Sequence, residues 1–242
     1  MPAARLLIRL VPTAAFLLVL PALIGLGFWQ LDRADQKRIL QAEYDDRLKQ
    51  APIKVAAALK PASELQYRRV SLSGYYDHDH TVLLDNRVHQ SVPGYYVITP
   101  LILIRSNTRV LVNRGWVPLG PSRATLPMVV PATTLQVITG VATVPHAKVF
   151  RLAPAAKIKS GWQRVWQHMD MKRFAQAVNY PVQPIVVLLD SSSQAEGFVR
   201  QWKRLDTRIT MHQGYAFQWF AMAFVLTGIY AFYTLRRFRK ND

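Results

Sequence analysis

Cysteine is absent from the 242 residues of the sequence. Its absence excludes disulfide bonds, thiolate catalysis, thiolate zinc sites and the covalent attachment of a c-type haem. Other motifs for chemistry are missing as well. The sequence has no glycine-rich phosphate-binding loop, and its run of serines from Ser191 to Ser193 lacks the flanking glycines of a nucleophile elbow. These absences weigh against an enzyme.

Acidic residues are scarce. The chain has 14 of them against 31 lysines and arginines, which gives a formal net charge of +17. Such a balance raises the question of nucleic acid, but the basic residues are scattered and show neither zinc-finger spacing nor a motif for single strands. We therefore expect no nucleic-acid partner. The basic cluster at the C-terminus is better explained by the anionic headgroups of membrane lipids.

Charge is missing altogether from two stretches, Leu10 to Trp29 and Gln213 to Leu235. Each is long enough to cross ~30 Å of hydrocarbon as a helix that rises 1.5 Å per residue. Neither shows the polar stripe of a buried core helix. We predict transmembrane helices over residues 10–29 and 212–235. The alternative for the first is a cleaved signal peptide, with a faint cleavage site at Gly25 to Gly27.

The orientation in the membrane follows from the short flanks. They carry Arg5, Arg9, Arg236, Arg237, Arg239 and Lys240. Short basic flanks stay in the cytoplasm, so we predict cytoplasmic tails at 1–9 and 236–242 and an external domain at 30–211. A mitochondrial presequence would have almost no room before residue 10. This favours a multi-pass protein of the bacterial inner membrane, with its domain in the periplasm.

The external domain begins with a polar, helix-forming stretch that Pro52 interrupts, and a β pattern follows it. The stretches with strand character are 67–77, 81–88, 94–104, 110–118, 135–144, 161–169 and 184–190. Ser106 and Asn107 are placed for a tight hairpin, and Asp170 can cap a short helix that reaches Val178. Many short strands with few helices between them predict an α+β domain. Its sheet is expected to be mainly antiparallel, either open or a partly closed barrel.

Two places in this domain could carry a site. His78 and His80 flank Asp79, and a His-x-His pair on one strand face can bind a metal; the alternative is a polar turn, and spacing names no third ligand. The other place is the end of the strand at 110–118. There Gly115 permits a bulge, Trp116 covers the sheet end and Arg114 pairs with an acid. The alternative is that Arg114 and Trp116 bind a partner protein.

Four stretches, taken in order, resemble the Surfeit-locus protein one family. They are GFWQLDRADQKR at 27–38, GYYVITPLILI at 94–104, VLVNRGWVP at 110–118 and HQGYAFQWFAMA at 212–223. The resemblance implies a factor without enzymatic activity that assists the assembly of cytochrome c oxidase. It implies that such a protein holds or delivers haem a for the catalytic subunit, beside other assembly factors. It also implies that the membrane-proximal histidine, here His212, ligates the haem iron.

The residues around His212 suit that role. On a helix, His212, Tyr215, Ala216 and Trp219 fall on one face, and the small Ala216 leaves room between flat rings. Trp29 lies at the external end of the first helix, at the same depth. We therefore expect the two helix ends to enclose a flat apolar ligand. Imidazole is a natural axial ligand of haem iron.

The propionates of haem a suit nearby cations, for which Arg33, Lys37 and Arg208 are the candidates. Tryptophan and tyrosine also belong at membrane interfaces without any ligand, so the aromatic residues alone do not decide the matter. Two other functions stay open at this point. One is a chaperone of the oxidase subunit that carries no haem, and the other is a membrane-tethered periplasmic enzyme.

Overall fold

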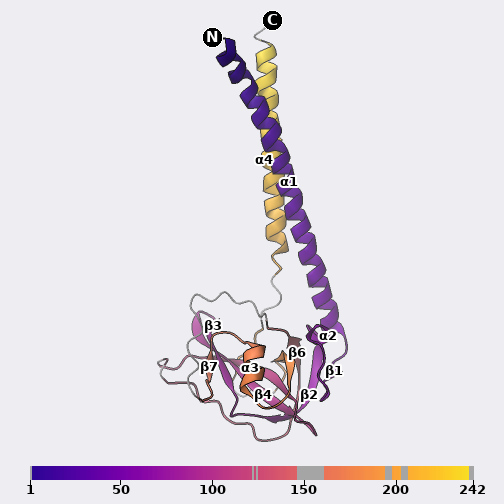
Figure 1. Ribbon diagram of the computed structural model, residues 1–242, viewed down its shortest axis with the longest axis vertical. Coiled ribbons are helices and arrows are strands. Elements are labelled where there is room, and N and C mark those ends of the chain that lie inside the picture. The colour runs from indigo at the N-terminus through magenta and orange to yellow at the C-terminus, as the bar shows by residue number, and fades with distance from the viewer. Residues whose placement is uncertain are drawn as a thin grey trace. The chain divides into compact units, whose positions relative to one another are not determined.

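The computed structural model describes residues 2–121, 123, 125–145, 161–193, 198–202 and 207–239. The chain forms two compact units (Figure 1). One unit combines Met1–Tyr44 with Leu205–Asp242 and is a pair of long helices. The other, Asp45–Arg204, is rich in β-structure. Each unit is described separately.

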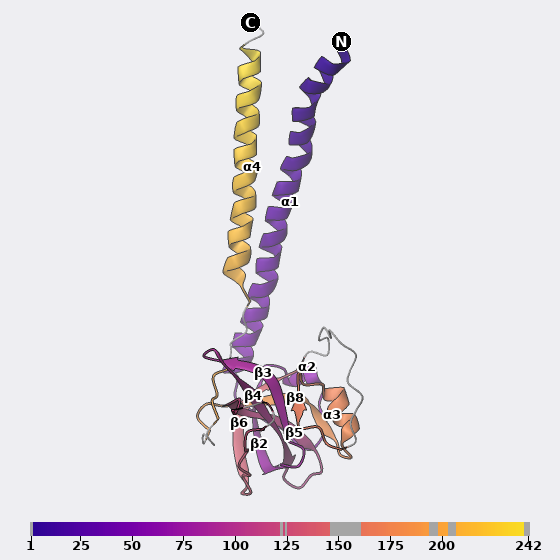
Figure 2. The ribbon, with the colours of Figure 1, turned by 90° about the vertical axis from the view of Figure 1, so that its left-hand side faces the viewer.

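The helix pair consists of α1 (Pro2–Lys49) and α4 (Ile209–Phe238). The helices run side by side and antiparallel, with both chain termini at the same end (Figures 1 and 2). With 48 residues, α1 is about 70 Å long, well over the thickness of a membrane core. It passes through residue 30 without a break and ends before Pro52, as the polar helical stretch predicted.

The outer surface of the helix pair is apolar. Both helices are long and apolar enough to cross a membrane. Their exposed large side chains include Leu17, Leu18, Phe217, Phe224, Ile229 and Phe232. A soluble protein rarely exposes so continuous an apolar surface to water. It is the surface that lipid requires, because hydrocarbon solvates such side chains readily.

The inner face of the pair is made of small residues. Gly27 is buried, and a Cβ atom added to it would lie 2.6 Å from the ring of Phe220. Ala216 and Ala223 of α4 are only 1% and 6% exposed. Small residues on facing helices let the two backbones approach closely, which is how membrane helices associate.

Aromatic contacts add to this packing along the pair. The ring of Phe28 meets that of Phe220 edge to face, with centroids 5.4 Å apart. Nearer the chain termini, the rings of Phe16 and Tyr230 stack at 4.1 Å, and the Tyr230 hydroxyl lies 3.1 Å from the Thr13 hydroxyl. These contacts fix the register of one helix against the other.

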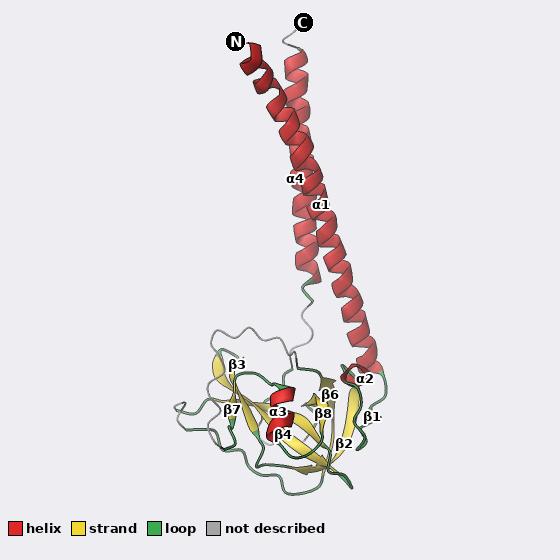
Figure 3. Ribbon diagram, in the orientation of Figure 1, coloured by secondary structure: helices red, strands yellow, loops and turns green. Residues whose placement is uncertain are grey.

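The β-rich unit is built on a closed barrel (Figure 3). Its elements are β1 (Ile53–Lys54), α2 (Ala62–Leu65), β2 (Arg69–Tyr76), β3 (Val82–His89), β4 (Val92–Leu103), β5 (Arg109–Pro118), β6 (Gln136–Thr143), β7 (Val165–Trp166), α3 (Met171–Ala177) and β8 (Val182–Leu189). The strands pair in the order β2, β6, β8, β5 and β4, and β4 pairs back with β2. Five strands thus close on themselves, which confirms the barrel prediction.

All of these barrel pairings are antiparallel except that of β5 with β8. The remaining strands extend the sheet from the barrel: β1 beside β2, β3 beside β4, and β7 beside β3. The mainly antiparallel character is as expected. The parallel pair arises because the chain between β5 and β8 crosses over through β6 and α3 before β8 enters the sheet.

The barrel core follows from alternation along the strands. In β2, Val70, Leu72, Gly74 and Tyr76 are buried, and the residues that alternate with them are more exposed. The buried cluster inside the barrel also includes Leu101, Leu103, Val110, Val112, Ile138, Ala142, Ile185, Val187 and Leu189. This period of two is the physical signature that made the strands recognisable in the sequence.

Local predictions had mixed outcomes. The hairpin after β4 forms at Ser106 and Asn107, and the Asp170 carboxylate accepts a hydrogen bond from the backbone of Arg173 to cap α3, as predicted. The strand expected over 161–169 is wrong for most of its length, because only β7 pairs with a neighbour. Trp162 and Trp166 instead pack around Phe174 in a second apolar cluster.

Candidate functional site

His212 lies in the first turn of α4, which begins after Arg208 in the left-handed region at φ +50°. The imidazole Nδ1 is 2.8 Å from the side-chain oxygen of Gln30 on α1. Both side chains are partly buried. The hydrogen bond joins the two helices at a single level, so it fixes the position of the imidazole ring against α1.

The enclosure that we expected beside Ala216 is absent. Ala216 is almost completely buried, and so is Ala34, which lies one turn beyond Gln30 on α1. Each is only 1% exposed. The small side chain serves close helix packing and leaves no gap between two flat rings. A ligand at His212 would have to lie on the outside of the helix pair.

The other candidates at this level are accessible from outside. Trp29 is 48% exposed and Tyr215 is 45% exposed, and Trp219 is partly buried. The guanidinium of Arg33 lies 5.7 Å from the centre of the Trp29 ring. An imidazole, three aromatic rings and a cation therefore occupy the same end of the pair, where apolar helix surface meets polar residues.

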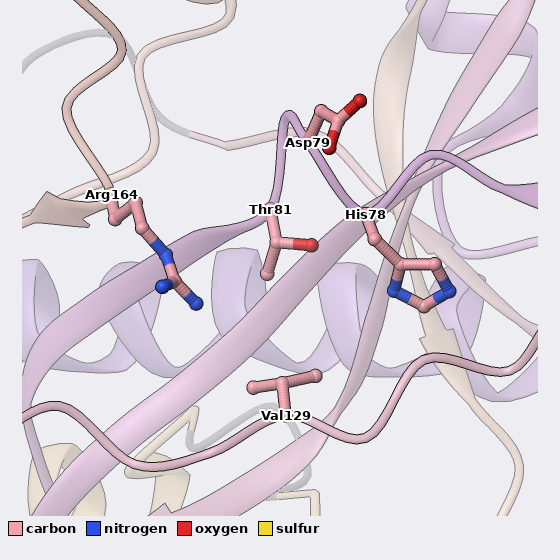
Figure 4. A pocket seen from close by; sticks show the side chains of 5 residues that line it. All are labelled: His78, Asp79, Thr81, Val129 and Arg164. Carbon is pink, nitrogen blue, oxygen red and sulfur yellow. The ribbon is translucent and has the colours of Figure 1, made fainter.

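A hollow of about 280 Å³ opens in the β-rich unit (Figure 4). It is lined by His78, Asp79, Thr81, Val129 and Arg164. The His78 Nε2 is 3.1 Å from the carbonyl oxygen of Ala132. The lining is polar and of mixed charge, which does not select one kind of ligand.

His78 and His80 do not converge on a metal. His80 turns to Asp77, with its Nδ1 2.9 Å from the carboxylate, and His78 turns to Ala132. Within the described ranges, no three residues of the types His, Cys, Asp and Glu are grouped to hold a metal ion. The alternative of a polar turn describes this stretch.

A compact polar cluster surrounds Asp77, and no motif in the sequence predicted it. Its carboxylate lies 2.9 Å from His80, 3.3 Å from the Tyr180 hydroxyl and 3.4 Å from Arg109 Nε. The Arg109 guanidinium stacks on the Tyr180 ring at 3.5 Å. Burial raises the pKa of the Tyr180 phenol, and the negative charge of Asp77 raises it further. The members come from distant parts of the chain, so spacing could not have joined them.

Arg114 and Trp116, the candidates for binding a partner, are both buried, with 0% and 7% exposure. The guanidinium of Arg114 lies between two rings, 4.6 Å from that of Tyr76 and 5.0 Å from that of Phe198. The indole nitrogen of Trp116 donates to the carbonyl oxygen of Arg87. This burial favours the interpretation of the stretch as packing within the domain.

The predicted bulge lies at Arg114, directly before Gly115. Opposite β4, Ile98 pairs with Asn113 and Val97 pairs with Gly115, so Arg114 is the extra residue of β5. Gly115 has φ +140°, and a Cβ atom there would lie 2.5 Å from that of Phe198. Only glycine fits this backbone and this space.

Comparisons with known proteins agree with this architecture. A model of the SURF1 family matches residues 17–224. A SURF1-like protein of Rickettsia felis is 28% identical over 232 residues, which cover 90% of this chain and 94% of that protein. The Surfeit locus protein 1 of Rattus norvegicus is 33% identical over 118 residues, 43% of this chain and 39% of that protein. The family match takes in the barrel, most of the apolar part of α1 and the part of α4 that holds His212. This chain belongs to the SURF1 family.

Proposed function

We propose that this chain is a membrane-anchored assembly factor for cytochrome c oxidase that holds haem a at His212 on its way to the catalytic subunit. The family resemblance implies the assembly role. The observation that carries the haem site is the state of the His212 imidazole: one ring nitrogen is hydrogen-bonded to Gln30, and among the described residues none is bonded to the other.

The residues around His212 fit haem a as a ligand. Neutral imidazole is a common axial ligand of haem iron. Trp29, Tyr215 and Trp219 offer aromatic surface to a flat ring, and the apolar flanks of the helices suit a long hydrocarbon tail. Arg33 supplies a cation for a propionate, with Lys37 and Arg208 as further candidates. The ligand would bind on the outer side of the pair, because Ala216 closes the inner side.

The proposal places α1 and α4 in the bacterial inner membrane, with both termini in the cytoplasm and the barrel in the periplasm. Support comes from the exposed apolar side chains of both helices and the arginines of the short flanks. A reporter fused after Asp242 that is active only in the cytoplasm should be active. Activity of a periplasm-specific reporter at the same position would contradict this topology.

The haem site is tested with protein purified from cells that make haem a. Wild type should show a Soret band and yield haem a in a pyridine haemochrome assay. His212→Ala should lose most of the haem at equal protein yield, because alanine keeps the helix and removes the nitrogen ligand. Trp219→Ala should lose less, since it removes packing alone.

The matched control is His168→Ala, which removes a partly buried histidine from the β-rich unit. It should keep its haem. If His212→Ala retains as much haem as wild type, the ligand lies elsewhere, and His78, His80, His89, His146 and His168 are the other histidines of the chain.

The second candidate function is a chaperone that contacts the oxidase subunit without carrying haem. The burial of Ala216 and Ala223 favours it, since these small residues are packed and do not line an open space for a ligand. Wild-type protein that supports oxidase maturation but never shows a Soret band would select this function. The proposal assigns no catalysis to the chain in either case.

A further inference from the structure

The two nitrogens of the His212 imidazole have different surroundings. Nδ1 is 2.8 Å from Gln30 Oε1, across the interface between α4 and α1. Within the described part of the chain, Nε2 has no hydrogen-bond partner. An amide oxygen can only accept, so the proton of this hydrogen bond belongs to the imidazole and sits on Nδ1.

The position of this proton decides which nitrogen can bind iron. A neutral imidazole carries one proton, and only the unprotonated nitrogen has a lone pair for a metal. In water, a free histidine side chain favours the tautomer with its proton on Nε2. An acceptor at Nδ1 reverses that preference, and it also orients the ring and strengthens the other nitrogen as a ligand.

We propose that Gln30 is a positioning residue for His212: its side-chain oxygen keeps the proton on Nδ1 and leaves Nε2 as the nitrogen that ligates iron. The ligation step rests on the proposed function. The tautomer itself is a property of the protein without haem.

The packing around the pair supports this assignment. Ala34 follows Gln30 by one helical turn, and Ala216 follows His212 by one turn; each is 1% exposed. Because the two helices are antiparallel, the buried alanines lie on opposite sides of the hydrogen bond along the pair, and close packing there limits the rotamers open to either side chain. The acceptor is held by the helix interface and does not depend on a mobile loop.

A hydrogen bond between membrane helices also stabilises their association. Stabilisation alone would make Gln30 a structural residue. The two roles differ in what they predict. A merely structural residue can be replaced by any side chain that packs equally well, whereas a positioning residue needs an acceptor atom.

The test uses full-length, haem-free protein in detergent with ¹⁵N-labelled histidine, studied by NMR at pH about 8.5, where an ordinary histidine is neutral. The spectrum of His212→Ala identifies the His212 signals. In wild type, the proton should be on Nδ1. Gln30→Met keeps the size and removes the acceptor, so the proton should move to Nε2. Gln30→Glu keeps an acceptor at this position, so the proton should stay on Nδ1 as in wild type.

Gln218→Met is the matched control. Gln218 is an exposed glutamine of the same helix pair, and its substitution should leave the His212 signals unchanged. With haem a added, Gln30→Met should bind about 10- to 100-fold more weakly, the usual loss when the hydrogen-bond partner of a metal-binding histidine is removed. Gln30→Glu and Gln218→Met should bind as wild type does.

A proton on Nε2 in wild type would overturn the inference, because it would mean that the Gln30 amide group donates to Nδ1. An unchanged tautomer in Gln30→Met would overturn it as well. A different result would contradict the proposed function alone. In that case the tautomer of His212 would depend on Gln30 as described, but His212→Ala would still bind haem.

Discussion

The helix pair and the barrel both expose large apolar side chains, but the two units differ in what lies beneath that surface. Leu18 of α1 is 75% exposed, and Val137 of β6 is 72% exposed. In the β-rich unit, Val137 is one of several exposed apolar residues, and the apolar cluster lies inside the barrel. In the helix pair, apolar residues face outward and small residues face inward.

The comparison shows that burial has a different meaning in each unit. In the barrel, apolar area removed from water drives folding. For a helix pair that spans a membrane, as proposed above, lipid is as apolar as leucine, so close packing of small residues and hydrogen bonds between the helices would hold the pair together. The hydrogen bonds at Gln30 and Tyr230 serve that purpose.

The largest effect is expected from adding a side chain at Gly115 of the barrel. Gly115→Val should destabilise the domain by roughly 2 to 6 kcal/mol, the sum of backbone strain and overpacking against Phe198. Arg114→Ala should cost less, since it leaves the backbone unstrained. Gly214→Val in α4, where a Cβ atom would meet nothing within 4 Å, is the control. Thermal unfolding followed by tryptophan fluorescence measures all three, and a normal midpoint for Gly115→Val would refute the bulge argument.

The second prediction compares the two kinds of exposed residue directly. Leu18→Lys should disfavour membrane insertion by roughly 2.5 to 3.5 kcal/mol, the cost of lysine at the centre of a membrane helix. Val137→Lys should change stability by less than about 0.5 kcal/mol, as for most surface substitutions. The measurement is the fraction of chains whose barrel is reached by protease added outside spheroplasts. Equal fractions for both variants would mean that Leu18 faces water.

A moderate effect is expected inside the helix pair. Gly27→Val places atoms against the Phe220 ring, which can shift, so the cost should be about 1 to 2 kcal/mol. Gly25→Val, where a Cβ atom meets nothing within 4 Å, should cost little. Because the chain has no cysteine, Gln30→Cys with His212→Cys gives a clean cross-link to report on the pair. The cross-link should form more slowly with Gly27→Val, and no difference from Gly25→Val would exclude close packing at Gly27.

The smallest effect concerns pH and the cluster at Asp77. The pKa of Tyr180 is raised in the folded protein, by burial first and by Asp77 next. The unfolded chain therefore releases this proton at lower pH than the folded one. The stabilisation is complete below pH about 10, the ordinary tyrosine value, and is lost as pH rises above it.

Chemical unfolding at pH 8 and pH 11 should therefore show a drop in stability for wild type. Tyr180→Phe should lose about 1 kcal/mol at pH 8, for the hydrogen bond to Asp77, and should fall less steeply towards pH 11. Identical slopes for the two proteins would mean that Tyr180 titrates normally.

The strands of the barrel could be predicted because each carries its own pattern: alternation in β2 and a continuous apolar run in β8. The closure of the barrel could not be predicted. It depends on the pairing of Gly74–Tyr76 with Leu101–Leu103 and on the parallel pairing of β5 with β8. The local pattern of a strand does not specify which strand it pairs with. The strand expected around Trp162 failed because large aromatic residues suit a core cluster as well as a strand.

At the candidate site, helical spacing correctly grouped His212 with Ala216 on one face. It could not say whether the alanine leaves a gap or admits a neighbouring helix. The sign of close approach lay on the other helix, at Gly27. The partner of His212, Gln30, is 182 residues away in sequence, so only the folded pair identifies it.

The order of the strands along the chain also determines when, during synthesis, the barrel can close. The barrel closes only when β8 inserts between β5 and β6, and the bridge from Trp116 to Val199 comes later still. Long-range pairings of this kind form slowly. In the topology proposed above, a chain exported as it is made would complete its barrel only after nearly the whole domain had crossed the membrane. By then α4, which begins at Ile209, would already be entering the export channel. Folding of the domain and release of the second helix into lipid would therefore compete within the same short interval.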